Sequence, residues 1–219
     1  MLVSPPSIAD HSESEAVTPG RLRLVVMRHG ATDLTGKVLN GGGGSAADPD
    51  LNDVGQSQVA RSGELLTRVG RPPAALTSPA RRARSTAQGL GYEAVVDERL
   101  REVDLGDWEG RVVADLHRED AGGVGRWLAD PEAAPPGGEP LLAVAERLAA
   151  LVRDLQTSGT EDLLLVGHAT TVALLVGAAL GSPIEHARRV ATPPGVVAGL
   201  SFWSDGGSAL ELLAAPATV

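Results

Sequence analysis

The stretch Leu22-Arg-Leu-Val-Val-Met-Arg-His-Gly30 decides the fold, because an apolar run ends abruptly in two basic side chains and a glycine. A short run rich in valine and leucine, followed by glycine, is typical of a buried strand in an α/β sheet. Sheets of this kind bind their ligands just beyond the carboxyl ends of the strands. Arg28 and His29 are therefore expected to lie where chemistry takes place.

The same pattern returns in Leu163-Leu-Leu-Val-Gly-His168, where an apolar run again ends in glycine and histidine. Around these two runs, the sequence alternates between predicted strands and predicted helices. Further strands are predicted at 74–77, 94–96, 196–203 and 209–214. Helices are predicted to begin near Asn52, ending before Arg71, and at Ser78-Pro79, and two more are predicted at 141–155 and 172–180. The alternation indicates an α/β fold, a three-layer α/β/α sandwich with a mostly parallel central sheet and an antiparallel strand near the C-terminus. Residues 112–140 are predicted to form a broken helix and a loop that covers the site.

Two helix starts carry polar side chains suited to capping. Asn52 or Asp53 is expected to cap the helix that begins there, and Ser78 is expected to cap the helix that follows Pro79. Between the first strand and the first of these helices, residues 31–53 form a glycine-rich segment. No Gly-Lys-Ser/Thr follows it, so a phosphate-binding P-loop is not indicated. A flexible surface loop is the favoured interpretation, although a loop this long in a compact domain is more often functional than idle.

Length and composition limit the class of protein. The 219 residues, 42% hydrophobic and 21% charged, fit one globular domain at 21–219 behind a flexible leader at 1–20. The leader lacks the cationic start of a secretory signal, and no apolar run reaches the roughly 18 residues of a membrane span. A cytoplasmic protein is expected.

Charge and cysteine content exclude several functions. The formal net charge is −9, which repels nucleic acid and anionic membranes, so an anionic small molecule would need a local basic site. The sequence has no cysteine, which excludes disulfides and thiolate catalysis. The histidine spacings match no metal motif, so neither a metal nor another cofactor is expected.

Residues at the ends of the predicted strands suggest an oxyanion site. Parallel strands would bring His29 and His168 together, and Arg82 lies at a helix start after another strand. Arginine suits bidentate phosphate recognition, although Arg82 and its neighbours Arg81 and Arg84 could equally form a solvated helix face. Glu102 follows a further strand and could act there as an acid, or it could be an ordinary solvated glutamate.

Five segments resemble, in order, the sequence blocks of the histidine phosphatase superfamily, the phosphoglycerate-mutase-like proteins. Residues 28–32 (Arg-His-Gly-Ala-Thr) are similar to the Arg-His-Gly-x-Thr signature of that family. The other similar segments are residues 78–87 (Ser-Pro-Ala-Arg-Arg-Ala-Arg-Ser-Thr-Ala), residues 100–110 (Leu-Arg-Glu to Gly-Asp-Trp-Glu-Gly), residues 136–139 (Pro-Gly-Gly-Glu) with Arg147, and residues 166–168 (Val-Gly-His). Five blocks in the right order make the resemblance specific.

The resemblance implies a role for each candidate. His29 would attack phosphorus and form a phosphohistidine, while Arg28, Arg82 and His168 would hold the phosphoryl oxygens. Glu102 would protonate the leaving alkoxide and then take a proton from water. A phosphohistidine requires a free ring nitrogen on His29, which family members secure through a backbone hydrogen bond at the other nitrogen.

The resemblance also implies where the substrate lies. Thr32, Thr35, Asn40, Gly41 and Ala169 would contact it. Thr35 stands where family members often have asparagine, and Asn40-Gly41 stands in for a usual Gln-Gly pair. Both departures lie in the loop that contacts substrate, so they affect specificity and not the core reaction.

The resemblance favours a hydrolase of small phosphate esters, similar to broad acid phosphatases and α-ribazole phosphatases. Two alternatives stay open. One is a phosphotransferase of the phosphoglycerate mutase type, and the other is a catalytically silent module that binds phosphate. The physiological substrate is also open, as is the assembly state, for which a homodimer is one candidate.

Overall fold

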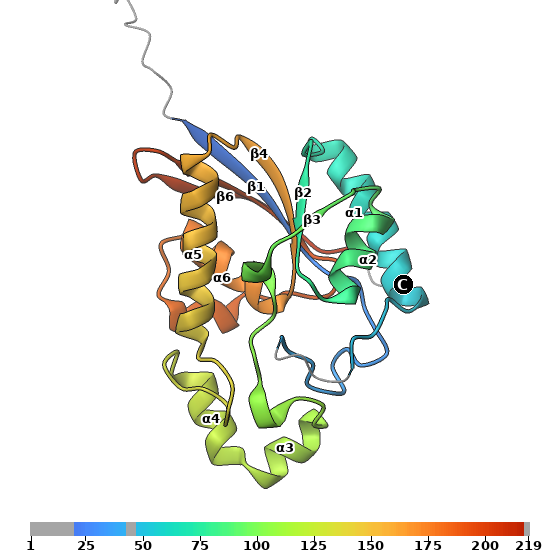
Figure 1. Ribbon diagram of the computed structural model, residues 1–219, viewed down its shortest axis with the longest axis vertical. Helices are drawn as coiled ribbons and strands as arrows, with labels where there is room; N and C mark the ends of the chain where they lie inside the picture. The colour runs from blue at the N-terminus through green and yellow to red at the C-terminus, as the bar shows by residue number, and fades with distance from the viewer. Residues whose placement is uncertain (1–19, 43–46, 217–219) are drawn as a thin grey trace, which may run out of the picture.

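A six-stranded sheet forms the centre of the computed structural model, which describes residues 20–42 and 47–216 (Figure 1). Its strands are β1 (Arg21–Arg28), β2 (Ala75–Thr77), β3 (Val95–Val96), β4 (Asp162–Gly167), β5 (Val197–Trp203) and β6 (Ser208–Ala214). They lie in the order β3-β2-β4-β1-β5-β6. The first four of these are parallel, whereas β5 runs antiparallel to β1 and to β6. The predicted mostly parallel sheet with an antiparallel strand near the C-terminus is confirmed.

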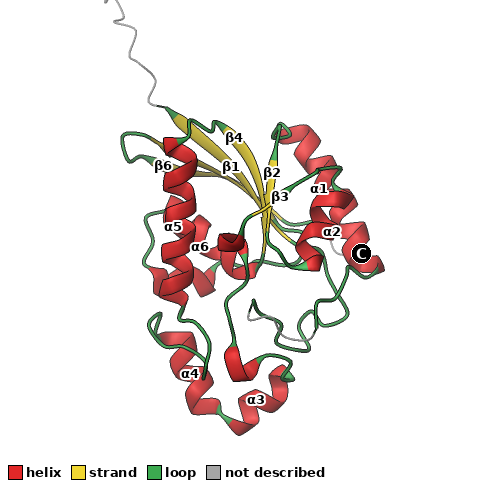
Figure 2. Ribbon diagram, viewed as in Figure 1, coloured by secondary structure: helices red, strands yellow, loops and turns green. Residues whose placement is uncertain are grey.

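Helices cover both faces of this sheet (Figure 2). One face carries α1 (Asp53–Val69) and α2 (Arg81–Gly89), and the other carries α5 (Leu141–Thr157) and α6 (Ala169–Ala179). Strand β1 shows why three layers form, because its side chains alternate between the two faces. Leu24 and Val26 belong to the core beneath α5 and α6, whereas Val25 and Met27 belong to the core beneath α1 and α2. All four are at most 1% exposed, so β1 is buried on both faces.

The segment predicted to cover the site forms two short helices. They are α3 (Val113–Glu119) and α4 (Ala121–Ala129), which Figure 1 shows beyond the carboxyl end of β1. Three 3₁₀ turns complete the described elements: η1 (Glu98–Leu100), η2 (Gly106–Trp108) and η3 (Ile184–Arg189). Trp108 of η2 packs edge-on against Trp127 of α4, with ring centroids 5.6 Å apart. This contact ties the covering helices to the segment that carries Glu102.

The two predicted helix caps have different outcomes. Asn52 caps α1, since its side-chain oxygen accepts a hydrogen bond from the Gly55 amide at 3.0 Å. The prediction that Ser78 caps α2 is wrong, because the helix begins at Arg81 and Ala80 occupies the cap position. The Ser78 hydroxyl lies instead 2.7 Å from Nε2 of His168. The Ser78 side chain thus contacts a residue 90 positions away in the sequence and not the start of helix α2.

Some predictions fall on residues that the structure does not describe. The predicted leader at 1–20 lies outside the described residues except for Gly20, and so do residues 43–46 of the glycine-rich segment. None of the helices in the described part of the chain has the length and apolar character needed to span a bilayer.

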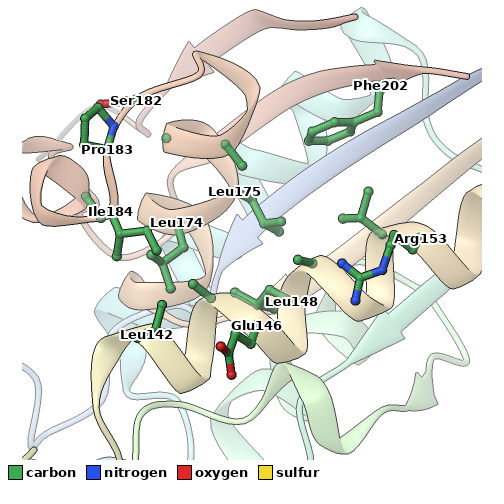
Figure 3. Close-up of a pocket in the computed structure, with 16 residues that line it drawn as sticks. Leu142, Glu146, Leu148, Arg153, Leu174, Leu175, Ser182, Pro183, Ile184 and Phe202 are labelled. Atoms are coloured by element: carbon green, nitrogen blue, oxygen red, sulfur yellow. The ribbon is translucent and has the colours of Figure 1, made fainter. Parts of the chain in front are cut away.

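An apolar groove opens between α5, α6 and η3, away from the ends of the parallel strands (Figure 3). Its volume is about 430 Å³, and Leu148, Leu175 and Phe202 are among the side chains that line it. It shares no lining residue with the cavity that contains His29.

Candidate functional site

The two histidines meet because β1 and β4 are adjacent and parallel. Arg28 pairs with Gly167 in the register of these strands, and the His29 amide donates to the Gly167 carbonyl at 3.0 Å. The next residue on each strand is then a histidine. The His29 and His168 rings lie edge to face, with centroids 5.2 Å apart. The sequence prediction that parallel strands unite them is confirmed.

Both nitrogens of His29 have defined neighbours. Nδ1 lies 2.7 Å from the Gly30 carbonyl, which can only accept, so Nδ1 carries the proton. Nε2 is then free to accept, and Nε of Arg82 donates to it at 3.3 Å. Burial lowers the pKa of His29 to about 3, with further lowering from the charges of Arg82 and Arg28. At neutral pH, His29 is an uncharged base with its lone pair on Nε2.

Arg82 connects the two histidines to the loop that follows β1. It is the second residue of α2 and is only 3% exposed. Its Nη2 lies 3.3 Å from Nδ1 of His168 and donates to the carbonyls of Asn40 and Gly41 at 3.2 and 3.3 Å. Burial lowers the pKa of Arg82, whereas Glu102 acts in the opposite direction, and a guanidinium stays charged under these conditions. The alternative of a solvated helix face is wrong for Arg82.

His168 is fully buried and held from both sides. With Arg82 donating to Nδ1, the proton of the neutral ring lies on Nε2 and is directed to the Ser78 hydroxyl. Burial lowers the pKa of His168 well below its ordinary value, and the charge of Arg82 lowers it further. His168 is therefore neutral, and it orients the Arg82 guanidinium.

Arg28 lies at the end of β1 and lines the same cavity as His29. Its Nη1 donates to the Thr192 carbonyl at 2.6 Å, which fixes the guanidinium. Its buried Nε has no hydrogen-bond partner among the described residues. Burial lowers the pKa of Arg28, while the charge of Glu102 opposes that effect. A buried donor without a partner is costly in a protein.

Glu102 is half-buried and lines the cavity with Arg28 and His29. One carboxylate oxygen accepts from the amide of Val103 at 3.0 Å. Arg147, in the segment noted in the sequence, braces the main chain behind it. Its Nη2 donates to the Glu102 carbonyl at 3.3 Å and pairs with Glu139 at 2.8 Å.

The cavity has a volume of about 230 Å³ and is lined by side chains from β1, its following loop, α2 and α4. Its lining includes Arg28, His29, Thr32, Thr35, Asn40, Arg82, Glu102, Trp127 and Thr170. A neighbouring pocket of about 270 Å³ adds Gly41, Asp48 and Arg101 and shares Asn40, Arg82 and Glu102. The five predicted catalytic positions therefore lie together, since His168 contacts Arg82 directly behind the cavity.

The predicted substrate-contacting residues differ in their placement. Thr35 accepts from the Thr32 amide at 2.9 Å, so its hydroxyl holds the loop closed on itself. The Gly41 amide donates to Glu109 at 2.8 Å, while Asn40 faces Arg82. Ala169 is absent from the lining of the His29 cavity; the neighbouring residue Thr170 occupies that position. Ala169 lines an adjoining cavity instead.

Sequence reasoning missed three polar groups of the site. They are the Ser78 hydroxyl on His168, the Thr192 carbonyl on Arg28 and the Thr86 hydroxyl, which accepts from the Gly30 amide at 3.1 Å. Ser78 and Thr86 lie within the family-like segment 78–87, so that segment contained the only available signal. Across the described ranges, no cluster of three or more histidine or acidic side chains is arranged to hold a metal ion.

Comparison with known proteins gives the family. The family model of the histidine phosphatase superfamily (branch 1) matches residues 24–214. The chain belongs to this superfamily. The match includes every predicted catalytic residue, both central histidines among them.

Two bacterial proteins illustrate the similarity of this histidine phosphatase chain to known sequences. Glucosyl-3-phosphoglycerate phosphatase of Mycolicibacterium vanbaalenii is 34% identical over 177 residues, covering 75% of this chain and 76% of that protein. Bifunctional protein Rv2228c of Mycobacterium tuberculosis is 34% identical over 197 residues, covering 87% of this chain. The chain spans 53% of the length of the latter, so about half of that relative has no counterpart here.

Solved structures agree with the fold. The mycobacterial glucosyl-3-phosphoglycerate phosphatase Rv2419c in complex with VO3 matches with a TM-score of 0.77 and 31% identity, over 90% of this chain and all of that one. The α-ribazole phosphatase from Shigella flexneri matches with a TM-score of 0.76 and 26% identity, over 90% and 98% of the two chains.

Proposed function

We propose that the chain is a phosphomonoester hydrolase that acts on a small phosphorylated metabolite through a phosphohistidine at His29. The observation that carries the proposal is the state of His29, a neutral imidazole whose unprotonated Nε2 faces a cavity with two arginines. Such a nitrogen is a nucleophile, and the arginines match the charge of a phosphoryl group.

The first step transfers the phosphoryl group to the enzyme. Nε2 of His29 forms a bond to phosphorus as the bond between phosphorus and the ester oxygen breaks. The protonated Glu102 carboxyl gives its proton to the departing alkoxide, so the leaving group departs as an alcohol. The position of Glu102 in the same cavity as His29 supports this role.

The second step regenerates the enzyme. A water molecule attacks phosphorus, the Glu102 carboxylate takes a proton from it, and the bond between phosphorus and Nε2 breaks. The products are inorganic phosphate and free His29. Arg28 and Arg82 neutralise the phosphoryl oxygens in both steps, and this electrostatic contribution is usually the largest in phosphoryl transfer. His168, which contacts Arg82 from behind the cavity, supports this role by orienting the guanidinium.

Within this function, the enzyme would be similar to acid phosphatases and would use no metal ion. Relatives named phosphatases support hydrolysis. A phosphotransferase that passes the phosphoryl group to a second hydroxyl is the alternative, because it would use the same phosphohistidine. Incubation with 3-phosphoglycerate separates the two, since a hydrolase releases free phosphate and a mutase yields an isomer.

Trapping the intermediate tests the proposal. Rapid quenching with a radiolabelled phosphate ester should leave acid-labile, alkali-stable label on the peptide that contains His29. His29→Ala should abolish both the label and phosphate release, whereas His117→Ala, which alters an exposed histidine of α3, should retain both. Turnover by His29→Ala would overturn the nucleophile assignment.

A further inference from the structure

A third arginine stands at the edge of the site, from an element that the proposed reaction does not use. Arg188 belongs to η3, and its guanidinium lies over the Trp127 ring, 3.9 Å from the ring centroid. Its Nη2 also donates to the Trp127 carbonyl at 3.2 Å. Stacking and hydrogen bonding to one residue hold this long side chain in a fixed direction.

The charge of Arg188 is not used in an ion pair. Among the described residues, no carboxylate lies within salt-bridge distance of it, although its side chain is exposed. Partial burial of the guanidinium lowers the pKa of Arg188, and the charge of Glu102 acts in the opposite direction. Arg101, which lines the neighbouring pocket, differs because it lies 3.6 Å from the Glu139 carboxylate.

Arg188 also lines a second cavity, which shares the lining residue Thr170 with the site. This adjoining cavity has a volume of about 320 Å³ and includes Thr170 and Thr192 with Arg188. Thr170 lines both cavities, Thr192 is the residue that fixes Arg28, and Trp127 lines the His29 cavity. The remainder of a substrate whose phosphoryl group lies between Arg28 and Arg82 therefore has room to extend toward Arg188.

We infer that Arg188, oriented by Trp127, binds a carboxylate on the leaving group, so the preferred substrates are phosphorylated hydroxy acids and not neutral sugar or polyol phosphates. The inference rests on the proposed phosphatase function and deepens it. A guanidinium presents a planar pair of donors that matches a carboxylate, and it does so here without first breaking an ion pair.

Two substrates that differ in one group test this inference. 3-Phosphoglycerate and glycerol 3-phosphate share their carbon chain, but the first ends in a carboxylate and the second in a hydroxymethyl group. The wild-type ratio of kcat/KM for the acid over the alcohol should be about tenfold or more. Arg188→Gln should bring this ratio close to one, mainly through a higher KM for the acid, and Arg188→Lys should restore part of it.

Controls keep this outcome separate from failure of the proposed function. Arg189→Gln removes an adjacent exposed charge outside both cavities and should keep the wild-type ratio. Circular dichroism of Arg188→Gln checks that the variant is folded. A wild-type ratio near one, or a ratio unchanged in a folded Arg188→Gln variant, overturns the assignment of Arg188. Absence of wild-type activity on p-nitrophenyl phosphate, which carries no carboxylate, would instead overturn the phosphatase function itself.

Discussion

At the scale of single residues, the two central histidines are kept uncharged by different contacts. The Gly30 carbonyl fixes the Nδ1 proton of His29, and Ser78 and Arg82 occupy the two nitrogens of His168. Burial beside two guanidinium groups makes a positive imidazole unfavourable in either position. Because the folded protein disfavours protonation of His29 and His168, its stability depends on pH.

The first prediction concerns stability at low pH. The folded-state pKa of His29 is about 3, below its ordinary value of 6.5, and that of His168 is lowered in the same direction. The unfolded chain therefore binds more protons between these values, so stability is lost as the pH falls from 6.5 toward 3. In urea unfolding from pH 7 to 4.5, His29→Gln should lose less stability than wild type, by up to about 1.4 kcal/mol per pH unit.

The comparison has its own control in His117→Gln, which changes an exposed histidine and should follow the wild-type pH profile. Equal slopes for wild type and His29→Gln would contradict a depressed pKa at position 29.

The second prediction concerns the acid. Glu102→Gln should slow hydrolysis of alkyl phosphates by roughly a hundredfold, because an alkoxide needs a proton to depart. Aryl phosphates should lose much less, since phenolates are better leaving groups. Initial rates on glycerol 3-phosphate and p-nitrophenyl phosphate measure the difference. Glu98→Gln, at an exposed carboxyl in η1, provides the control. Equal losses on both esters would argue against Glu102 as the acid.

At the scale of elements, the loop after β1 closes directly on the segment that carries Glu102. The Gly42 amide donates to the Val103 carbonyl at 2.9 Å. A Cβ added at Gly42 would stand 2.1 Å from the Glu102 carbonyl, which is far inside van der Waals contact. Only glycine permits this approach, so the loop and the acid are positioned together.

The third prediction follows from that approach. Gly42→Ala should push the loop off the Glu102 segment and lower kcat/KM by roughly tenfold or more, because small displacements at a reacting centre are costly. Gly122→Ala is the matched control, as a Cβ there meets no atom within 4 Å and alanine favours helix α4. Steady-state kinetics on one aryl phosphate compare the two variants. Full activity in Gly42→Ala would show that the loop does not position Glu102.

Features that depend on neighbouring residues could be predicted from the sequence, whereas contacts between residues distant in the sequence could not. Strands β1 and β4 were predictable because apolar runs report burial locally. Ser78 was misassigned because its partner His168 lies 90 positions away, and a local capping pattern contains nothing about that contact. The Thr192 carbonyl, 164 positions from Arg28, was not predictable at all, since every residue has such a carbonyl. The resemblance to a known family supplied the remaining site positions.

At the scale of the whole molecule, a protein with a negative net charge contains a cavity lined by positively charged side chains. The formal net charge is −9, yet Arg28 and Arg82 line one small cavity. Their mutual repulsion and the unpartnered Nε of Arg28 make the free site unfavourable. An anion bound between Arg28 and Arg82 would reduce their mutual repulsion.

The fourth prediction is therefore stabilisation by inorganic phosphate. At a concentration about a hundred times Kd, bound phosphate should add about 2.7 kcal/mol and raise Tm by roughly 5–10 °C. Arg82→Met should remove the shift, whereas Arg84→Met, at an exposed position on the same helix, should retain it. Differential scanning fluorimetry measures both. An equal shift in Arg82→Met would place the anion elsewhere.

The fifth prediction concerns metals. Dialysis against excess EDTA should leave the phosphatase activity unchanged, because the proposed chemistry draws its positive charge from arginine. Loss of activity that added divalent metal restores would contradict the proposed metal-free reaction.

The position of β1 between β4 and β5 has a consequence for how the chain reaches its active form. Arg23 on β1 forms its ion pair with Asp162, which lies 139 positions further along the chain. Contacts between residues so far apart in the sequence form slowly, because the entropy cost of closing a large loop comes before the contact can stabilise the fold. Because His29 and His168 meet where β1 pairs with β4, the site is complete only once this long-range pairing has formed.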